Sequence, residues 1–156
     1  MFKELLTQPM VLPITVPLLA ALVCRLLPRS AEALRAGFAV VIAAVVVALA
    51  WPLFQQSGLA FEPHPWLSLR LDALSGFVLL AVACFGLFIA IYSIGYMKGH
   101  EGHRTYFSCF LLTLSMACGV LLANDLLFLV VCWGLLGVTL YLMIGIAGPD
   151  ASEAAR

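Results

Sequence analysis

Few side chains in this sequence are able to hold a charge or move a proton, and their positions limit the chemistry. Asp72 and Asp125 are the carboxylates nearest to the long apolar segments, and each stands at the expected start of a helix. A carboxylate there accepts hydrogen bonds from free backbone N–H groups and is favoured by the positive end of the helix dipole. We expect both residues to act as helix caps or, alternatively, to line the outer mouth of a proton path.

Two other groups of residues resemble metal sites only superficially. The run His100-Glu101-Gly102-His103 lacks the His-Glu-x-x-His spacing of zinc proteases, so we expect a solvated turn. The cysteines form no Cys-x-x-Cys pair and lie in apolar runs, where we expect small buried hydrophobic residues; they are Cys24, Cys84, Cys109, Cys118 and Cys132. The expectation is therefore that this chain binds no metal and no cofactor.

The last apolar segment is rich in small and hydroxylated residues. Gly134 and Gly137 are three positions apart and adjoin Trp133, so they predict a face that packs closely against another helix. Thr139 on this segment and Thr113 on the preceding one can bond each other between helices, or each can bond its own backbone. Thr139 joins the two carboxylates as a candidate for an ion path.

The elements that must position these residues are five uncharged stretches of 20 residues or more. A helix rises about 1.5 Å per residue, so about 20 residues cross a hydrocarbon core of roughly 30 Å. With 64% hydrophobic and 10% charged residues among 156, the composition argues against a soluble globular domain. We predict an all-α integral membrane protein, a single domain over residues 1–156, with five transmembrane helices at about 5–27, 34–56, 72–97, 104–123 and 125–147.

The expected connections are short. Residues 57–71 contain Pro63 and Pro65, which do not fit a helix, and then alternate apolar and polar residues. This stretch predicts an outer loop with a short strand or hairpin on the membrane surface. Residues 148–156 predict a short polar tail.

The basic residues indicate an orientation. With five crossings, one side of the membrane holds Lys3 and Arg70, and the other holds six basic residues: Arg25, Arg29, Arg35, Lys98, Arg104 and Arg156. The positive-inside rule therefore places the N-terminus outside and the C-terminus in the cytoplasm. Eight basic residues balance eight acidic ones without a basic stripe, so nothing indicates a nucleic-acid partner.

Several motifs in the second half identify a family resemblance. In order, they are Leu71-Asp72-Ala73-Leu74-Ser75, Tyr92-Ser93-Ile94-Gly95-Tyr96-Met97, Tyr106-Phe107, Ala123-Asn124-Asp125-Leu126-Leu127, Trp133, and Tyr141-Leu142-Met143-Ile144-Gly145. From about Leu69 to Ile146 the sequence resembles the N-terminal part of the antiporter-like membrane subunits of respiratory complex I, group 4 membrane hydrogenases and Mrp-type antiporters. It is most similar to the NADH-quinone oxidoreductase subunit L type.

The resemblance implies a place in a membrane complex. It implies a subunit that contributes to proton or sodium translocation coupled to electron transport, beside other membrane subunits and with lipid or quinone nearby. It also implies a bacterial or archaeal inner or plasma membrane. At most, such a chain is a non-catalytic subunit of an oxidoreductase or hydrogenase.

One position departs from the family pattern. The tryptophan corresponding to Trp133 is normally followed by a glutamate, which pairs with a lysine on a later helix and shifts protons by changing partners. Gly134 stands in that position here, and the printed sequence does not reach the lysine-bearing helix. We expect the remaining antiporter helices on a separate chain, unless this is a truncated gene product. A Gly134→Glu substitution is expected to give partial proton coupling or loss of assembly.

Three hypotheses remain open from the sequence. The chain is a shortened antiporter-like subunit that translocates ions with its partners, or it is a structural or assembly subunit without an ion path of its own. The third hypothesis, a small independent transporter, requires a polar group at mid-membrane, and none is evident in the apolar stretches.

Overall fold

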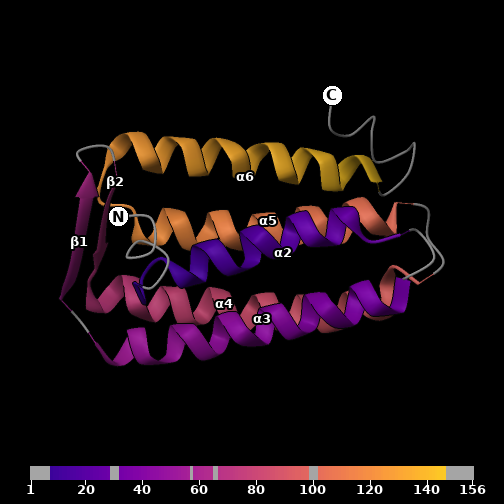
Figure 1. Ribbon diagram of the computed structural model, residues 1–156, viewed down its shortest axis with the longest axis horizontal. Coiled ribbons are helices and arrows are strands. Elements are labelled where there is room, and N and C mark those ends of the chain that lie inside the picture. Colours follow the sequence, from indigo (N-terminus) through magenta and orange to yellow (C-terminus); the bar gives the residue numbers. More distant parts are fainter. Residues whose placement is uncertain (1–7, 29–31, 57, 65–66, 99–101, 147–156) are drawn as a thin grey trace.

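The structure, a computed structural model, describes residues 8–28, 32–56, 58–64, 67–98 and 102–146. These residues form five helices, which are α2 (Leu12–Leu26), α3 (Glu32–Gln55), α4 (Ala73–Tyr96), α5 (His103–Leu122) and α6 (Leu126–Ile146). They also form an antiparallel hairpin of β1 (Leu59–His64) and β2 (Leu67–Leu71). The helices run along the long axis of the molecule, and the hairpin lies across one end (Figure 1).

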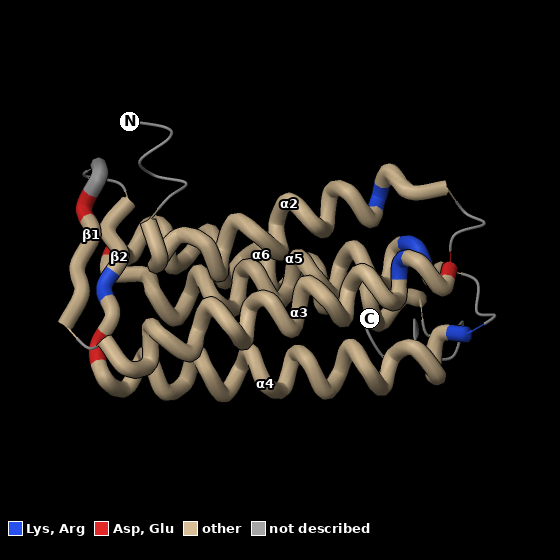
Figure 2. The backbone as a smooth tube through the Cα atoms, turned by 60° about the horizontal axis from the view of Figure 1, so that its bottom comes forward, with Lys and Arg blue, Asp and Glu red and all other residues tan. Residues whose placement is uncertain are grey.

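The distribution of charge fits a membrane. Four of the helices, α3 to α6, are long and apolar enough to cross a bilayer, and α2 is a shorter apolar helix. Within the described chain, the charged residues gather at the two ends of the bundle and leave its middle uncharged (Figure 2). This arrangement defines an integral membrane protein, because a charge in the hydrocarbon region is costly and charges at the ends remain hydrated.

The helix boundaries agree with the hydropathy pattern except at the start of α2. Residues 5–7 of the expected first helix lie outside the described residues, and α2 begins at Leu12 after a turn in which Val11 N–H donates to the Gln8 carbonyl at 3.0 Å. Pro13 fits the first turn of the helix, where a backbone N–H has no partner to lose. Pro17 lies inside α2, so the helix continues past a proline.

Helices α3 and α4 pack against each other, and each carries a buried stripe in which small residues are frequent. The stripe on α3 repeats about every fourth residue: Arg35, Ala39, Ala43, Val46, Ala50 and Leu53. The stripe on α4 does the same: Gly76, Leu79, Ala83, Gly86, Ala90 and Ser93. Small side chains let two backbones approach closely, and this close packing replaces the hydrophobic drive that is missing in lipid.

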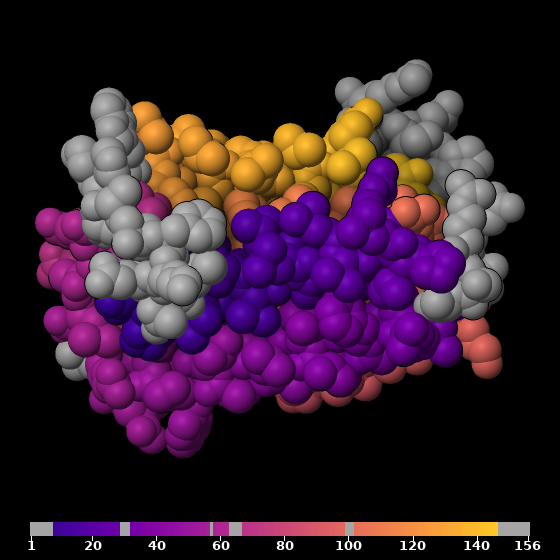
Figure 3. All heavy atoms as spheres, in the orientation of Figure 1, coloured from indigo at the N-terminus to yellow at the C-terminus, as the bar shows by residue number. Residues whose placement is uncertain are grey.

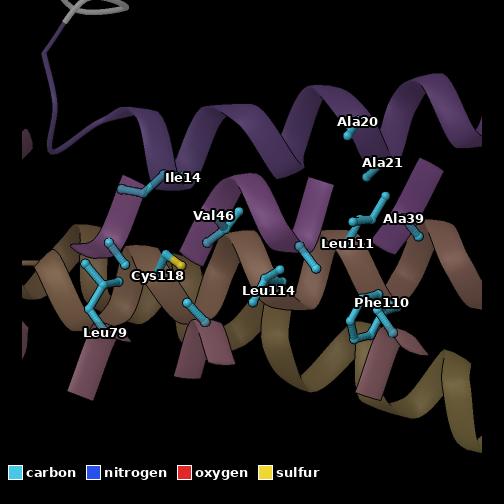
Figure 4. Close-up of a cluster of buried hydrophobic side chains, with 14 of the residues drawn as sticks. Ile14, Ala20, Ala21, Ala39, Val46, Leu79, Phe110, Leu111, Leu114 and Cys118 are labelled. Atoms are coloured by element: carbon cyan, nitrogen blue, oxygen red, sulfur yellow. The ribbon is translucent and has the colours of Figure 1, made fainter. Parts of the chain in front are cut away.

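Helix α5 is the centre of the bundle. It packs against α2, α4, α6 and part of α3. Figure 4 shows Ile14 of α2, Val46 of α3 and Leu79 of α4 converging on α5 near its own Leu111. In the space-filling view little of α5 is visible between α2 and α6 (Figure 3). The position of α5 explains why it has many more buried residues than α6.

Candidate functional site

The candidate site begins at the contact between α5 and α6. The Thr113 hydroxyl lies 2.9 Å from the hydroxyl of Thr139, which in turn donates to the Leu136 carbonyl at 2.9 Å. Thr113 also lies 2.8 Å from the Cys109 carbonyl, and its single proton serves one of these two acceptors at a time. The structure therefore allows both expected hydrogen bonds of Thr113, the one to Thr139 on the other helix and the one to its own backbone. Thr139 is buried, about 20 Å along α6 from its first residue.

The same two helices also touch at a glycine of α5. A Cβ atom added to Gly119 would lie 2.9 Å from the Cys132 sulfur and 3.8 Å from the Phe128 ring. The absence of a side chain on Gly119 therefore allows α6 to lie against α5. Cys132 is itself buried, so its sulfur has little room to move away.

The opposite face of α6 is open. Added Cβ atoms at Gly134 and Gly137 would meet nothing within 4 Å, and Trp133 is 68% exposed. Among the described elements α6 packs mainly against α5, and Cys132 and Thr139 are its buried residues. Gly134 lies about 12 Å along a helix of 21 residues, close to the middle of the apolar region. The described residues therefore leave the expected packing face uncovered, and its contact with another chain stays a prediction.

Asp72 lies at the hairpin end of the bundle as the N-cap of α4. It forms a capping box with Ser75, whose hydroxyl accepts a hydrogen bond from the Asp72 backbone N–H at 2.8 Å. Its carboxylate is 3.2 Å from the Arg70 Nε atom, and both side chains are more than half exposed. An exposed pair of this kind is screened by water and contributes little to stability.

Asp125 lies at the same end, in the turn between α5 and α6. Its carbonyl accepts the backbone N–H of Leu129 at 3.0 Å, as the residue before a helix does. The preceding residue, Asn124, bonds Ser68 of β2 twice, at 2.8 Å through its backbone N–H and at 2.8 Å through its side-chain amide. The hairpin and this turn are thus joined across the end of the bundle.

These candidates do not form one catalytic cluster. Asp72 caps α4 at the hairpin end and Asp125 precedes α6 at the same end, whereas Thr139 lies about 20 Å away along α6. Within the described part of the chain, no group of three or more His, Cys, Asp or Glu residues is arranged to hold a metal ion. What the arrangement offers is a part-buried hydroxyl pair between α5 and α6, on the side of α6 opposite the open apolar face, and such a contact suits helix packing.

Sequence reasoning missed a polar contact at the other end. His103 was expected in a solvated turn, but it is buried as the first residue of α5 and lies 3.2 Å from an Arg35 Nη atom. Residues 99–101, the rest of that expected turn, lie outside the described residues. A signal was present, since Arg35 precedes Ala39 and Ala43 at the four-residue spacing of the buried α3 stripe.

Comparisons with known proteins agree on one family. The family described as "NADH-Ubiquinone oxidoreductase (complex I), chain 5 N-terminus" matches residues 64–107. The "Probable inorganic carbon transporter subunit DabB" of Bacillus anthracis is 34% identical over 53% of this chain and 16% of its own length. The "NADH-quinone oxidoreductase subunit L" of Buchnera aphidicola is 36% identical over 50% of this chain and 13% of its own length. The "NADH-quinone oxidoreductase subunit N" of Desulforudis audaxviator is 29% identical over 93% of this chain and 31% of its own length.

The fold and the charge distribution define the class, an integral membrane protein built as a helical bundle. The comparisons confirm the resemblance that the motifs indicated, to the N-terminal part of the antiporter-like membrane subunits. The chain spans between 13% and 31% of the length of the three relatives described above.

Proposed function

We propose that this chain is a membrane subunit of a cation-translocating assembly and contributes to proton or sodium translocation together with partner subunits. The observation that carries the proposal is the open face of α6. Gly134 occupies the position where the resemblance implies a proton-shifting glutamate, and open space surrounds it within this chain. A glycine cannot hold a proton, so any ionisable group at this depth comes from a partner helix packed on this face.

The proposal includes five membrane crossings, with α2 as the shortest. The hairpin end lies outside and the end with Arg25, Arg35, Lys98 and Arg104 lies in the cytoplasm. The positive-inside rule supports this orientation, because within the described chain the basic residues are concentrated at the second end. The partners are other membrane subunits of the same assembly.

The test adds bulk to the open face without changing charge. Gly134→Leu places an isobutyl group at mid-membrane, and Ala44→Leu places the same group on the exposed side of α3 as a matched control. If α6 docks on a partner, Gly134→Leu lowers the yield of tagged complex from native membranes in mild detergent, whereas Ala44→Leu does not. Equal yields of the complex from both variants and from wild type would reject an interface at Gly134.

A second function is favoured by two relatives. Proteins named "Probable inorganic carbon transporter subunit" are 34% and 37% identical to about half of this chain. Under this alternative the same open face serves a carbon-transport assembly. Deleting the gene would then cause slow growth in air that added CO2 repairs, with cation translocation driven by electron transport unchanged. A loss of that translocation, not repaired by CO2, supports the first proposal.

The alternative to both functions is a structural role, in which the chain has no ion path of its own. In that case deletion destabilises the complex, but the number of ions moved per electron stays the same in the complex that remains. A changed ratio with assembly intact would exclude the purely structural role.

A further inference from the structure

A buried arginine and a buried histidine meet where the first turns of α3 and α5 come together. Arg35 is 1% exposed and His103 is 5% exposed. One guanidinium nitrogen, Nη1, lies 3.2 Å from His103 Nδ1, and the other, Nη2, donates to the Pro28 carbonyl at 2.8 Å. Arg35 Nε has no hydrogen-bond partner, and no carboxylate of the described chain pairs with Arg35. Within the described chain, His103 and the Pro28 carbonyl are therefore the two hydrogen-bond partners of this buried guanidinium.

The chemistry of the two groups decides which one donates. A guanidinium has five N–H donors, no acceptor, and a charge that it keeps throughout the physiological range. His103 Nδ1 must therefore offer its lone pair, which leaves the proton of a neutral ring on Nε2. An imidazolium would turn an N–H toward Arg35 and place two cations 3.2 Å apart in a nearly dry site.

We propose that the Arg35–His103 contact is a proton-sensitive latch between α3 and α5. The latch is closed while the imidazole is neutral and opens when the ring takes up a second proton. Opening separates the first turns of the two helices and exposes Arg35 at this end of the bundle. Because α5 is the central helix, a change at its first turn is transmitted to its contacts with α2 and α6.

The surroundings of the histidine favour the neutral ring. The Phe107 ring lies 4.7 Å from the imidazole and forms an apolar wall. The Arg35 guanidinium, 3.2 Å from Nδ1, opposes an imidazolium by direct repulsion. The other charged or titratable groups of the described chain at this end are Cys24 and Arg25 on α2, Tyr96 and Lys98 at the end of α4, and Arg104, Tyr106 and Cys109 on α5. This end is therefore mostly cationic, and Glu32 is its acidic residue among those described.

The test uses the full chain in nanodiscs of zwitterionic lipid, with ¹⁵N-labelled histidine. At pH 7.5 we expect an unprotonated Nδ1 and a protonated Nε2 for His103. Below about pH 6.5 His103 binds a proton in the unfolded chain but not in the closed latch. The unfolding equilibrium constant therefore rises by up to about tenfold for each pH unit by which the pH is lowered. His103→Asn supplies an acceptor oxygen near the Nδ1 position but has no titrating group. This variant should therefore lose the rise in the unfolding equilibrium constant at low pH.

His64→Asn is the matched control, because this histidine belongs to β1 at the opposite end, and its pH profile should follow that of wild type. A protonated Nδ1 at pH 7.5 would overturn the proposal, and so would a His103→Asn profile identical to that of wild type. Should His103→Asn fail to fold, the tautomer measured on the wild-type chain decides the question. In that case Arg35→Gln supplies the second measurement, since without the guanidinium His103 should take up its proton at higher pH.

Discussion

Gly119→Ala is the substitution that tests the packing of α6 most sharply. The new Cβ would lie 2.9 Å from the Cys132 sulfur and 3.7 Å from its Cβ, and the first distance is shorter than van der Waals contact allows. Because Cys132 is 2% exposed, its side chain has little room to move away, and α5 and α6 must shift apart to relieve the clash. Overpacking of a buried site typically costs about 1–3 kcal/mol.

The matched control is Gly134→Ala on the open face of α6, where the added methyl meets nothing within 4 Å. Both substitutions gain the same helix propensity of about 1 kcal/mol. The difference between the two variants therefore isolates the overpacking at Gly119. We expect Gly119→Ala to be less stable than Gly134→Ala by about 1–3 kcal/mol.

The assay is reversible unfolding in mixed micelles, followed by circular dichroism. The double variant Gly119→Ala/Cys132→Ala removes the sulfur that the new methyl meets, so its cost should be smaller than the sum of the single costs by at least about 0.5 kcal/mol. Additive costs, or equal stabilities for Gly119→Ala and Gly134→Ala, would show that α6 does not lie against Gly119.

Three further substitutions test smaller contacts by the same unfolding assay. Thr139→Val removes the hydroxyl that faces α5 and should cost about 0.6 kcal/mol, the average for interhelical hydrogen bonds in lipid; no change would show that the contact is not formed. Ser75→Ala removes half of the capping box with Asp72 and should cost about 0.5–1 kcal/mol, with faster hydrogen exchange confined to the first turn of α4. Asn124→Ala removes the side-chain bond to Ser68 and should cost about 0.5–1.5 kcal/mol, and unchanged exchange in β2 would contradict this bond.

The sequence predicts the helices well because their signal is length and apolarity. Each of the segments from residue 32 onward appears within a few residues of its expected bounds. The start of α2 was missed because an apolar run reads as helix even where a turn precedes Pro13. The hairpin was indicated by the alternation from Leu67 to Leu71, which matches a strand with one buried face.

The pairing of helix faces was harder to predict. Small residues occur on α3, α4 and α6, but the rotation of each helix decides which stripe meets a partner within the chain. The structure packs α3 against α4, whereas Gly86 and Ser93 of the α4 stripe meet α5, and the described residues leave Gly134 and Gly137 open. The sequence analysis counted Arg35 only among the basic residues of one membrane side, because hydropathy alone does not show that it continues a buried stripe.

The central claim is that the open face of α6 is a subunit interface. The most direct measurement places a photo-reactive amino acid at Gly137 and, as the control, at Ala44, and irradiates native membranes. We predict that position 137 forms a covalent product with a second membrane subunit, identified by mass spectrometry, and that position 44 forms only lipid adducts. Lipid adducts alone at both positions would contradict the account.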